Sequence, residues 1–123
     1  MHILITDDMI TSRIQISVAV KSMGYTYREA ANGNEAIKKL NEESFDLILM
    51  DIEMPVMNGL ETTRYIRKHL SDPKKRNIPI LAITAHEWDD ISTQWESTGF
   101  SGFISKPISP EKLSAAMQAL GIK

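Results

Sequence analysis

The sequence predicts an α/β fold, in which a doubly wound five-stranded parallel sheet carries five helices on its two faces. Short apolar runs of strand length alternate along the chain with longer stretches of helical periodicity. Glycine and proline punctuate the boundaries between these segments, as they do at helix caps and turns. Such alternation favours parallel pairing, because each helix returns the chain across one face of the sheet.

The expected strands are short and mostly apolar, and they span residues 2–6, 25–30, 46–50, 79–84 and 101–105. Near-continuous apolar runs at 3–5, 47–50 and 80–83 place three of these strands in the centre of the sheet. A central parallel strand is buried on both faces and therefore needs apolar side chains on both. The mixed polarity of residues 25–30 places that strand near an edge.

The expected helices follow the strands at residues 9–23, 33–43, 59–70, 87–97 and 109–120. The polar stretch 71–77 is expected to be a solvated surface loop. No linker, internal repeat or low-complexity tract interrupts this order, so residues 1–123 are expected to form one domain.

The composition excludes several classes of protein. Hydrophobic residues make up 42% of the chain and charged residues 24%, as in soluble globular domains. The net charge of −2 provides no basic field for nucleic acid or an anionic membrane, and no apolar run reaches membrane-spanning length. The absence of cysteine excludes disulfides and thiolate chemistry. We expect a cytoplasmic domain that contacts neither nucleic acid nor membrane directly.

Polar side chains stand at the carboxyl ends of four expected strands. In chain order they are Asp7 and Asp8, Asp51, Thr84 and Lys106. In an open parallel sheet, ligands bind beyond these ends, at the point where the strand order reverses. Acids combined there with one hydroxyl and one ammonium are the pattern of a phosphoryl and metal site.

Each of these residues also has an ordinary structural explanation. Asp7 and Asp8 suit the capping of a helix that starts near residue 9 as well as they suit metal binding. Asp51 alone could be a loop-capping acid, Thr84 alone is more often an ordinary strand-end residue, and Lys106 before proline would usually be a solvated surface charge. Their joint occurrence at adjacent strand ends favours the functional explanation.

Several short segments at the strand ends match one known family in order and position. They are Ile5–Thr6–Asp7–Asp8, Leu49–Met50–Asp51, Met54–Pro55 through Gly59, Ile83–Thr84–Ala85, and Gly99 through Ser105–Lys106–Pro107. With this set the chain resembles a response regulator receiver domain of the CheY-like, flavodoxin-like type over essentially its full length. The stretches 54–59 and 105–108 are most similar to receivers of hybrid sensor histidine kinases. The resemblance implies the strand order 2-1-3-4-5.

The resemblance also implies the phosphoryl chemistry. Asp51 would accept the phosphoryl group from a phosphohistidine donor, and Thr84 and Lys106 would each contact a phosphoryl oxygen. Ala85 is small, as a residue beside the approaching group must be. The Lys106–Pro107 bond is a candidate cis peptide. Such a domain is not a turnover enzyme, although it assists its own phosphorylation and dephosphorylation.

The implied metal is Mg²⁺, with Mn²⁺ as an alternative. Asp8, Asp51 and the backbone carbonyl of Glu53 would bind it directly, and Asp7 would bind it through a water. Three carboxylates and one ammonium sum to −2, which a divalent ion neutralises.

Three further positions follow from the resemblance. Glu53 and His86 would flank the phosphoryl group and set the lifetime of the acyl phosphate. Phe103 stands where receivers often carry an aromatic ring that moves together with the Thr84 hydroxyl on activation. Ordinary strand packing of Phe103 is an equally open explanation.

The first expected helix carries two apolar stripes. One stripe, which should face the sheet, consists of Ile16, Val20 and Met23. The second consists of Ile10, Ile14 and Val18 and would flank the acidic pocket. We predict that this second stripe docks a histidine kinase or a histidine-phosphotransfer domain. Cover by neighbouring loops or by the adjacent helix is the alternative.

Other functions and settings stay open. The chain could be a receiver fold that works by constitutive protein contact without phosphorylation, although a degenerate site would be expected to lose a member of the set. An aspartyl-phosphate hydrolase would need a Thr beyond Glu53, and a flavodoxin would carry glycines and hydroxyls in place of Asp7–Asp8. The family also suggests a homodimer through the fourth helix, fifth strand and fifth helix. The stimulus, and whether the domain is free-standing or part of a membrane-bound hybrid kinase, are left open.

Overall fold

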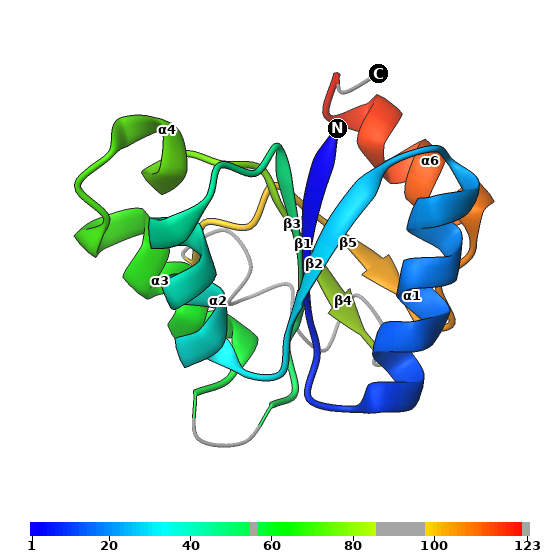
Figure 1. Ribbon diagram of the computed structural model, residues 1–123, viewed down its shortest axis with the longest axis horizontal. Helices are drawn as coiled ribbons and strands as arrows, with labels where there is room; N and C mark the ends of the chain where they lie inside the picture. The colour runs from blue at the N-terminus through cyan, green and yellow to red at the C-terminus, as the bar shows by residue number, and fades with distance from the viewer. Residues whose placement is uncertain (55–56, 86–97, 122–123) are drawn as a thin grey trace.

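The computed structural model describes residues 1–54, 57–85 and 98–121 (Figure 1). Its sheet has five parallel strands in the order β2-β1-β3-β4-β5. The strands are β1 (His2–Thr6), β2 (Thr26–Ala30), β3 (Leu47–Asp51), β4 (Ile80–Thr84) and β5 (Gly102–Ser105). The predicted fold class and strand order are confirmed, and each strand lies within one residue of its predicted bounds.

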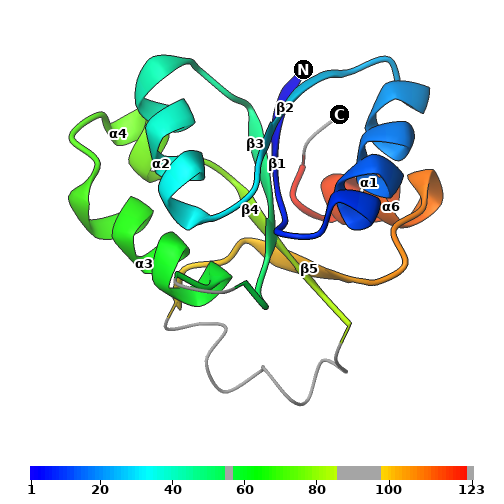
Figure 2. The ribbon, with the colours of Figure 1, turned by 60° about the horizontal axis from the view of Figure 1, so that its bottom comes forward.

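Helices cover both faces of the sheet. They are α1 (Ile10–Ser22), α2 (Gly33–Glu42), α3 (Gly59–His69), α4 (Pro73–Arg76) and α6 (Pro110–Ala119). One face carries α1 and α6, and the other carries α2 and α3 (Figure 1 and Figure 2). The predicted helix 87–97 lies outside the described residues.

Alternation along the strands fills two apolar cores. Ile3 and Ile5 of β1 pack in the core that contains Ile16 and Val20 of α1. Leu4, between them, packs in the core on the opposite face, which contains Leu40 of α2. This is the period-two alternation of a strand that is buried on both sides. All residues of β3 and β4 are buried, as the apolar runs predicted.

The stretch 71–77 differs from the surface loop predicted for it, because it contains the one-turn helix α4. The Asp72 side chain accepts a hydrogen bond from the Lys74 N–H (2.9 Å), and Pro73 occupies the first helical position. An Asp cap followed by proline pre-organises a helical turn. The loop prediction, which rested on the polar composition of this segment, did not take that helix-start pattern into account.

The start of α3 shapes the loop after β3. Asn58 and Glu61 form a capping box, in which each side chain accepts a hydrogen bond from the other residue's backbone N–H. The Gly59 N–H also donates to the Ile52 carbonyl (2.9 Å). These bonds tie the helix to the end of β3, where Asp51 stands. Within the described ranges, no helix is long and apolar enough to cross a membrane.

Candidate phosphoryl and metal site

Three carboxylates meet at the carboxyl ends of β1 and β3, along the lower edge of the sheet in Figure 1. Asp7 and Asp8 directly follow β1, and Asp51 is the last residue of β3. The two strands are neighbours at the point where the strand order reverses. One oxygen from each carboxylate lies within 4.8 Å of the others. Sheet topology therefore gathers acids that are far apart in sequence.

Asp7 is buried and held by its neighbours. Its N–H donates to the Ala30 carbonyl (3.1 Å), and its Oδ1 accepts from the Met9 N–H (2.9 Å). Met9, rather than either acid, is the N-cap residue of α1, and its side chain makes no capping hydrogen bond. Neither Asp7 nor Asp8 is therefore the N-cap residue, although the Asp7 carboxylate holds the turn into the helix through the Met9 N–H, and Asp8 is the exposed member of the cluster.

Asp51 is a buried acid with a raised pKa. Its exposed fraction is 2%, and its Oδ1 accepts a hydrogen bond from the Glu53 N–H (3.3 Å). Burial raises the pKa of Asp51 to about 7, with Asp7 adding to the rise and Lys106 opposing it. A carboxylate in this setting ionises readily only when a cation stands close to it.

Lys106 supplies one such cation. Its ammonium lies 3.3 Å from Asp7 Oδ2 and 3.5 Å from Asp51 Oδ1. Burial by itself lowers the pKa of Lys106, but the carboxylates of Asp51 and Asp7 outweigh burial, so the pKa rises above its usual value. The Lys106–Pro107 peptide bond is cis. The Lys106 N–H donates to the carbonyl of Thr84 (2.8 Å), which ties the loop to the end of β4.

The donor atoms suit a hard divalent cation. Asp7 Oδ2 is buried, and within the described residues its polar neighbour is the Lys106 ammonium at 3.3 Å, with no further hydrogen bond. A metal ion or its bound water would satisfy the remaining acceptor capacity of this buried oxygen. Among the described residues the cluster consists of three carboxylates, a set of oxygen donors that fits Mg²⁺ or Mn²⁺.

The remaining predicted site residues lie at or just after the ends of β3 and β4. Thr84 is buried at the end of β4, while the side chains of Ala85 and Glu53 are exposed. His86 lies outside the described residues. The structure thus brings together three acids and one lysine, with Thr84 at the end of the next strand.

Phe103 lies two positions before the end of β5 and is half-buried against the core on the α2 and α3 face. It pairs with Ala82, and Ala82 precedes Thr84 by two residues. Residues two apart in a strand point to the same face, so Thr84 and Phe103 share one side of the sheet. This arrangement is compatible with both explanations of Phe103.

The two apolar stripes of α1 differ in solvent exposure. Ile16 and Val20 are buried against the sheet. Ile10, Ile14 and Val18 are 63%, 55% and 61% exposed, so the alternative that neighbouring elements cover this stripe is wrong.

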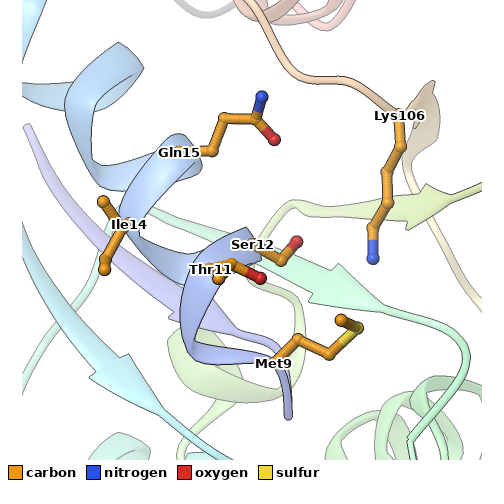
Figure 3. Close-up of a pocket in the computed structure, with 6 residues that line it drawn as sticks. All are labelled: Met9, Thr11, Ser12, Ile14, Gln15 and Lys106. Atoms are coloured by element: carbon orange, nitrogen blue, oxygen red, sulfur yellow. The ribbon is translucent and has the colours of Figure 1, made fainter.

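A pocket separates α1 from Lys106, which faces it from across the gap (Figure 3). Its volume is about 520 Å³, and its lining consists of Met9, Thr11, Ser12, Ile14, Gln15 and Lys106. The sequence interpretation missed the polar members Thr11, Ser12 and Gln15. Their positions could have been predicted from the sequence, because they lie in the first turns of the helix that directly follows Asp7 and Asp8. Residues 11 and 15 are one turn apart and therefore lie on the same face of that helix.

The chain matches known proteins along most of its length. Residues 3–118 match the family model of the response regulator receiver domain. It is 36% identical to the CAI-1 autoinducer sensor kinase/phosphatase CqsS of Vibrio cholerae, covering 86% of this chain and 15% of that protein. It is 34% identical to Histidine kinase 5 of Arabidopsis thaliana, covering 94% of this chain and 15% of that protein. The chain therefore spans only a small part of these curated relatives.

Solved structures show the same fold. The chemotaxis protein CheY4 of Vibrio cholerae superimposes with a TM-score of 0.86 at 31% identity, covering 97% of both chains. The receiver domain of a sensor histidine kinase of Pseudomonas aeruginosa, described with a magnesium ion coordinated in the active site cleft, gives a TM-score of 0.84 at 27% identity, covering 98% of this chain and 97% of that one. With its fold, its strand-end acids and the match over residues 3–118, the chain belongs to the response regulator receiver domains, the phosphoryl-accepting domains of two-component and phosphorelay signalling.

Proposed function

We propose that this domain accepts a phosphoryl group on Asp51 from a phosphohistidine donor, in a magnesium-dependent step. The observation that carries the proposal is the buried Asp51 carboxylate within a cluster that also holds Asp7, Asp8 and the ammonium of Lys106 at 3.5 Å. A phosphoryl group is anionic, so a carboxylate nucleophile can receive it only where cations offset both charges.

In the proposed step, a carboxylate oxygen of Asp51 attacks the phosphorus atom of the phosphohistidine. A P–O bond forms as the P–N bond breaks, and its electron pair returns to the imidazole nitrogen, which takes up a proton from solvent. The product is an acyl phosphate on Asp51. Because the pKa of Asp51 is raised to about 7, a cation beside it would increase the ionised, nucleophilic fraction at neutral pH.

Mg²⁺, when bound, supplies positive charge that offsets the phosphoryl oxygens. Asp8, Asp51 and the Glu53 backbone carbonyl would hold it directly, and Asp7 would hold it through a water. Mn²⁺ offers the same preference for oxygen and is expected to substitute. Support comes from the three clustered carboxylates among the described residues and from the magnesium-containing Pseudomonas aeruginosa receiver.

The residues around the acceptor would share the remaining work. The Lys106 ammonium would pair with one phosphoryl oxygen, and the Thr84 hydroxyl would donate to another. Ala85 leaves room for the group to approach. Glu53 and His86 would flank the acyl phosphate and set its lifetime, so that the domain assists its own dephosphorylation without being a turnover enzyme.

Phosphorylation would reach the rest of the domain through Thr84 and Phe103. Their side chains share one side of the sheet, which supports a movement of the ring when the Thr84 hydroxyl is drawn toward the phosphoryl group. NMR signals of the Phe103 ring should shift on phosphorylation in the wild type. An equal shift in phosphorylated Thr84→Val would contradict this coupling.

The exposed stripe of Ile10, Ile14 and Val18 would dock the donor, which is a histidine kinase or a histidine-phosphotransfer domain. The stripe adjoins the pocket that Lys106 lines, so a partner seated on α1 could present its histidine to the acid cluster. A homodimer would use the face that includes β5 and α6. The predicted helix 87–97, its third component, is not among the described residues.

This single domain of residues 1–123 would work in the cytoplasm, without direct contact with nucleic acid or membrane. Its similarity to parts of sensor kinases favours a receiver that belongs to a phosphorelay. The phosphorylation-independent alternative has no observation in its favour, because the acceptor, the acid pair, the hydroxyl and the lysine are all present.

Incubation with a small phosphodonor and Mg²⁺ tests the proposal. The wild-type mass should increase by one phosphoryl group, and hydroxylamine should remove it, because an acyl phosphate is labile to that nucleophile. Asp51→Asn should gain no mass, while the matched variant Asp72→Asn, at the start of α4, should label like the wild type. Labelling of Asp51→Asn at the wild-type level would overturn the assignment.

A further inference from the structure

The Asp7–Asp8 peptide is held from several directions. The Asp7 N–H donates to the Ala30 carbonyl of β2 (3.1 Å), and the Asp7 carboxylate contacts the Met9 N–H (2.9 Å). Its remaining polar group, the backbone carbonyl, accepts a hydrogen bond from Nη1 of Arg13 (2.8 Å). A trans peptide is planar, so fixing this carbonyl also fixes the plane from which Asp8 departs.

Arg13 reaches that carbonyl from one turn inside α1. Its Nε donates to Oε1 of Glu29 (3.1 Å), the residue before the last of β2, so one planar guanidinium bridges two strand ends. The Arg13 side chain is only 16% exposed. A largely buried guanidinium that is hydrogen-bonded to two acceptors is fixed in orientation, because both donor groups belong to one rigid plane.

The charge of Arg13 does not explain its position. Glu29 already offsets the positive charge at 3.1 Å, and the guanidinium approaches Asp7 through the backbone carbonyl rather than through the carboxylate. A cation close to a metal site repels the metal. Its charge alone would therefore weaken metal binding, whereas its hydrogen bond would strengthen binding by pre-setting the ligand.

We infer that Arg13, oriented by Glu29, is a positioning residue that pre-sets the Asp7–Asp8 peptide for a divalent cation. The inference rests on the metal site of the proposed function. Asp8 gains most, because its carboxylate is exposed and its direction depends on the backbone that carries it. This hydrogen bond holds the backbone of the two acids in the geometry needed to bind the ion, so binding costs less conformational entropy.

The two possible roles of Arg13 predict opposite changes, which titration calorimetry with MgCl₂ can separate. If Arg13 positions the peptide, Arg13→Gln lowers magnesium affinity by roughly 10-fold, in the range of residues that orient metal ligands. If only its charge matters, the same variant binds magnesium more tightly. Arg13→Lys keeps the charge but lacks the planar guanidinium. A positioning role therefore predicts weaker magnesium binding in this variant, whereas a role of charge alone predicts no change in affinity.

Arg28→Gln is the matched control, because it removes the same charge from an exposed position next to Glu29 on β2. It should bind magnesium like the wild type. Thermal melting in EDTA checks that each variant is folded, and Arg13→Lys decides the result if Arg13→Gln is not. Unchanged or tighter binding in the folded Arg13 variants would overturn this inference alone. A wild type that binds no magnesium would overturn the proposed function as well.

Discussion

Gly59, the first residue of α3, lies directly against the backbone of Asp51. A Cβ at position 59 would collide with the Asp51 carbonyl oxygen and stand 2.8 Å from the Ile52 Cα. Both obstacles are backbone atoms, which cannot swing aside as a flexible side chain does. The absence of a side chain at position 59 therefore allows α3 to start against the strand end that carries the acceptor.

Gly59→Ala should push α3 away from β3 and disturb the loop that includes the Glu53 carbonyl. We expect a loss of unfolding free energy of about 1–3 kcal/mol, as for other overpacked positions, together with weaker magnesium binding. Denaturant unfolding and calorimetry measure the two effects. Gly24→Ala is the control, because its φ of +81° also strains an alanine but nothing lies within 4 Å of its Cβ. It should lose stability without losing magnesium affinity, and equal losses of affinity would contradict the explanation.

Asp51 should make the metal-free protein less stable as pH rises. Its pKa is about 7 when folded and near 3.8 for an unperturbed Asp, so between these values the folded protein keeps a proton that the unfolded chain releases. Stability linked to this group is present below pH 4 and is lost progressively toward pH 7. Asp51→Asn should remove this loss and exceed the wild type by on the order of 3 kcal/mol at pH 8 in EDTA.

Denaturant unfolding of both proteins from pH 4 to pH 8 provides the measurement. Added Mg²⁺ should raise the stability of the wild type more at pH 8 than at pH 6, because protons compete with the ion for the carboxylate. Parallel pH curves for wild type and Asp51→Asn would show that the folded pKa of Asp51 is not raised.

Lys106→Met should separate metal binding from phosphoryl transfer. The ammonium stands 3.3 Å and 3.5 Å from oxygens of two acids, so its removal should strengthen magnesium binding. The same change removes a donor for the phosphoryl oxygens and should slow labelling by roughly 100-fold, as loss of one such donor does elsewhere. Lys74→Met, in α4, removes an equal charge and should alter neither quantity. Slower labelling explained entirely by weaker magnesium binding would count against this role.

Ile14→Glu should interfere with a protein donor but not with a small one. The side chain is 55% exposed in the docking stripe, so a charge there leaves the fold intact while opposing an apolar partner surface. Transfer from a cognate histidine-phosphotransfer domain should slow by roughly 10-fold or more, with acetyl phosphate labelling unchanged. Tyr65→Glu on α3 serves as the control for an exposed substitution elsewhere. Equal slowing with both donors would rule out docking through this stripe.

Local features of the sequence determined the elements and much of the site. The apolar runs 47–50 and 80–83 predicted the buried central strands, because a parallel strand covered on both faces tolerates few polar side chains. Strand-end acids, a hydroxyl and a lysine marked the site, since carboxyl ends of parallel strands share one edge of a sheet. The strand order, in contrast, came from resemblance to a family.

Tertiary structure alone decided the contacts that make this set of residues a site. Periodicity identified two apolar stripes on the first helix, but only the packed fold shows which remained exposed. Neither the Arg13 hydrogen bond to the Asp7 carbonyl nor the close approach of Gly59 to Asp51 is visible in the sequence. Propensity and periodicity report on neighbours along the chain, whereas these contacts depend on how loops bring separate strand ends within a few ångströms.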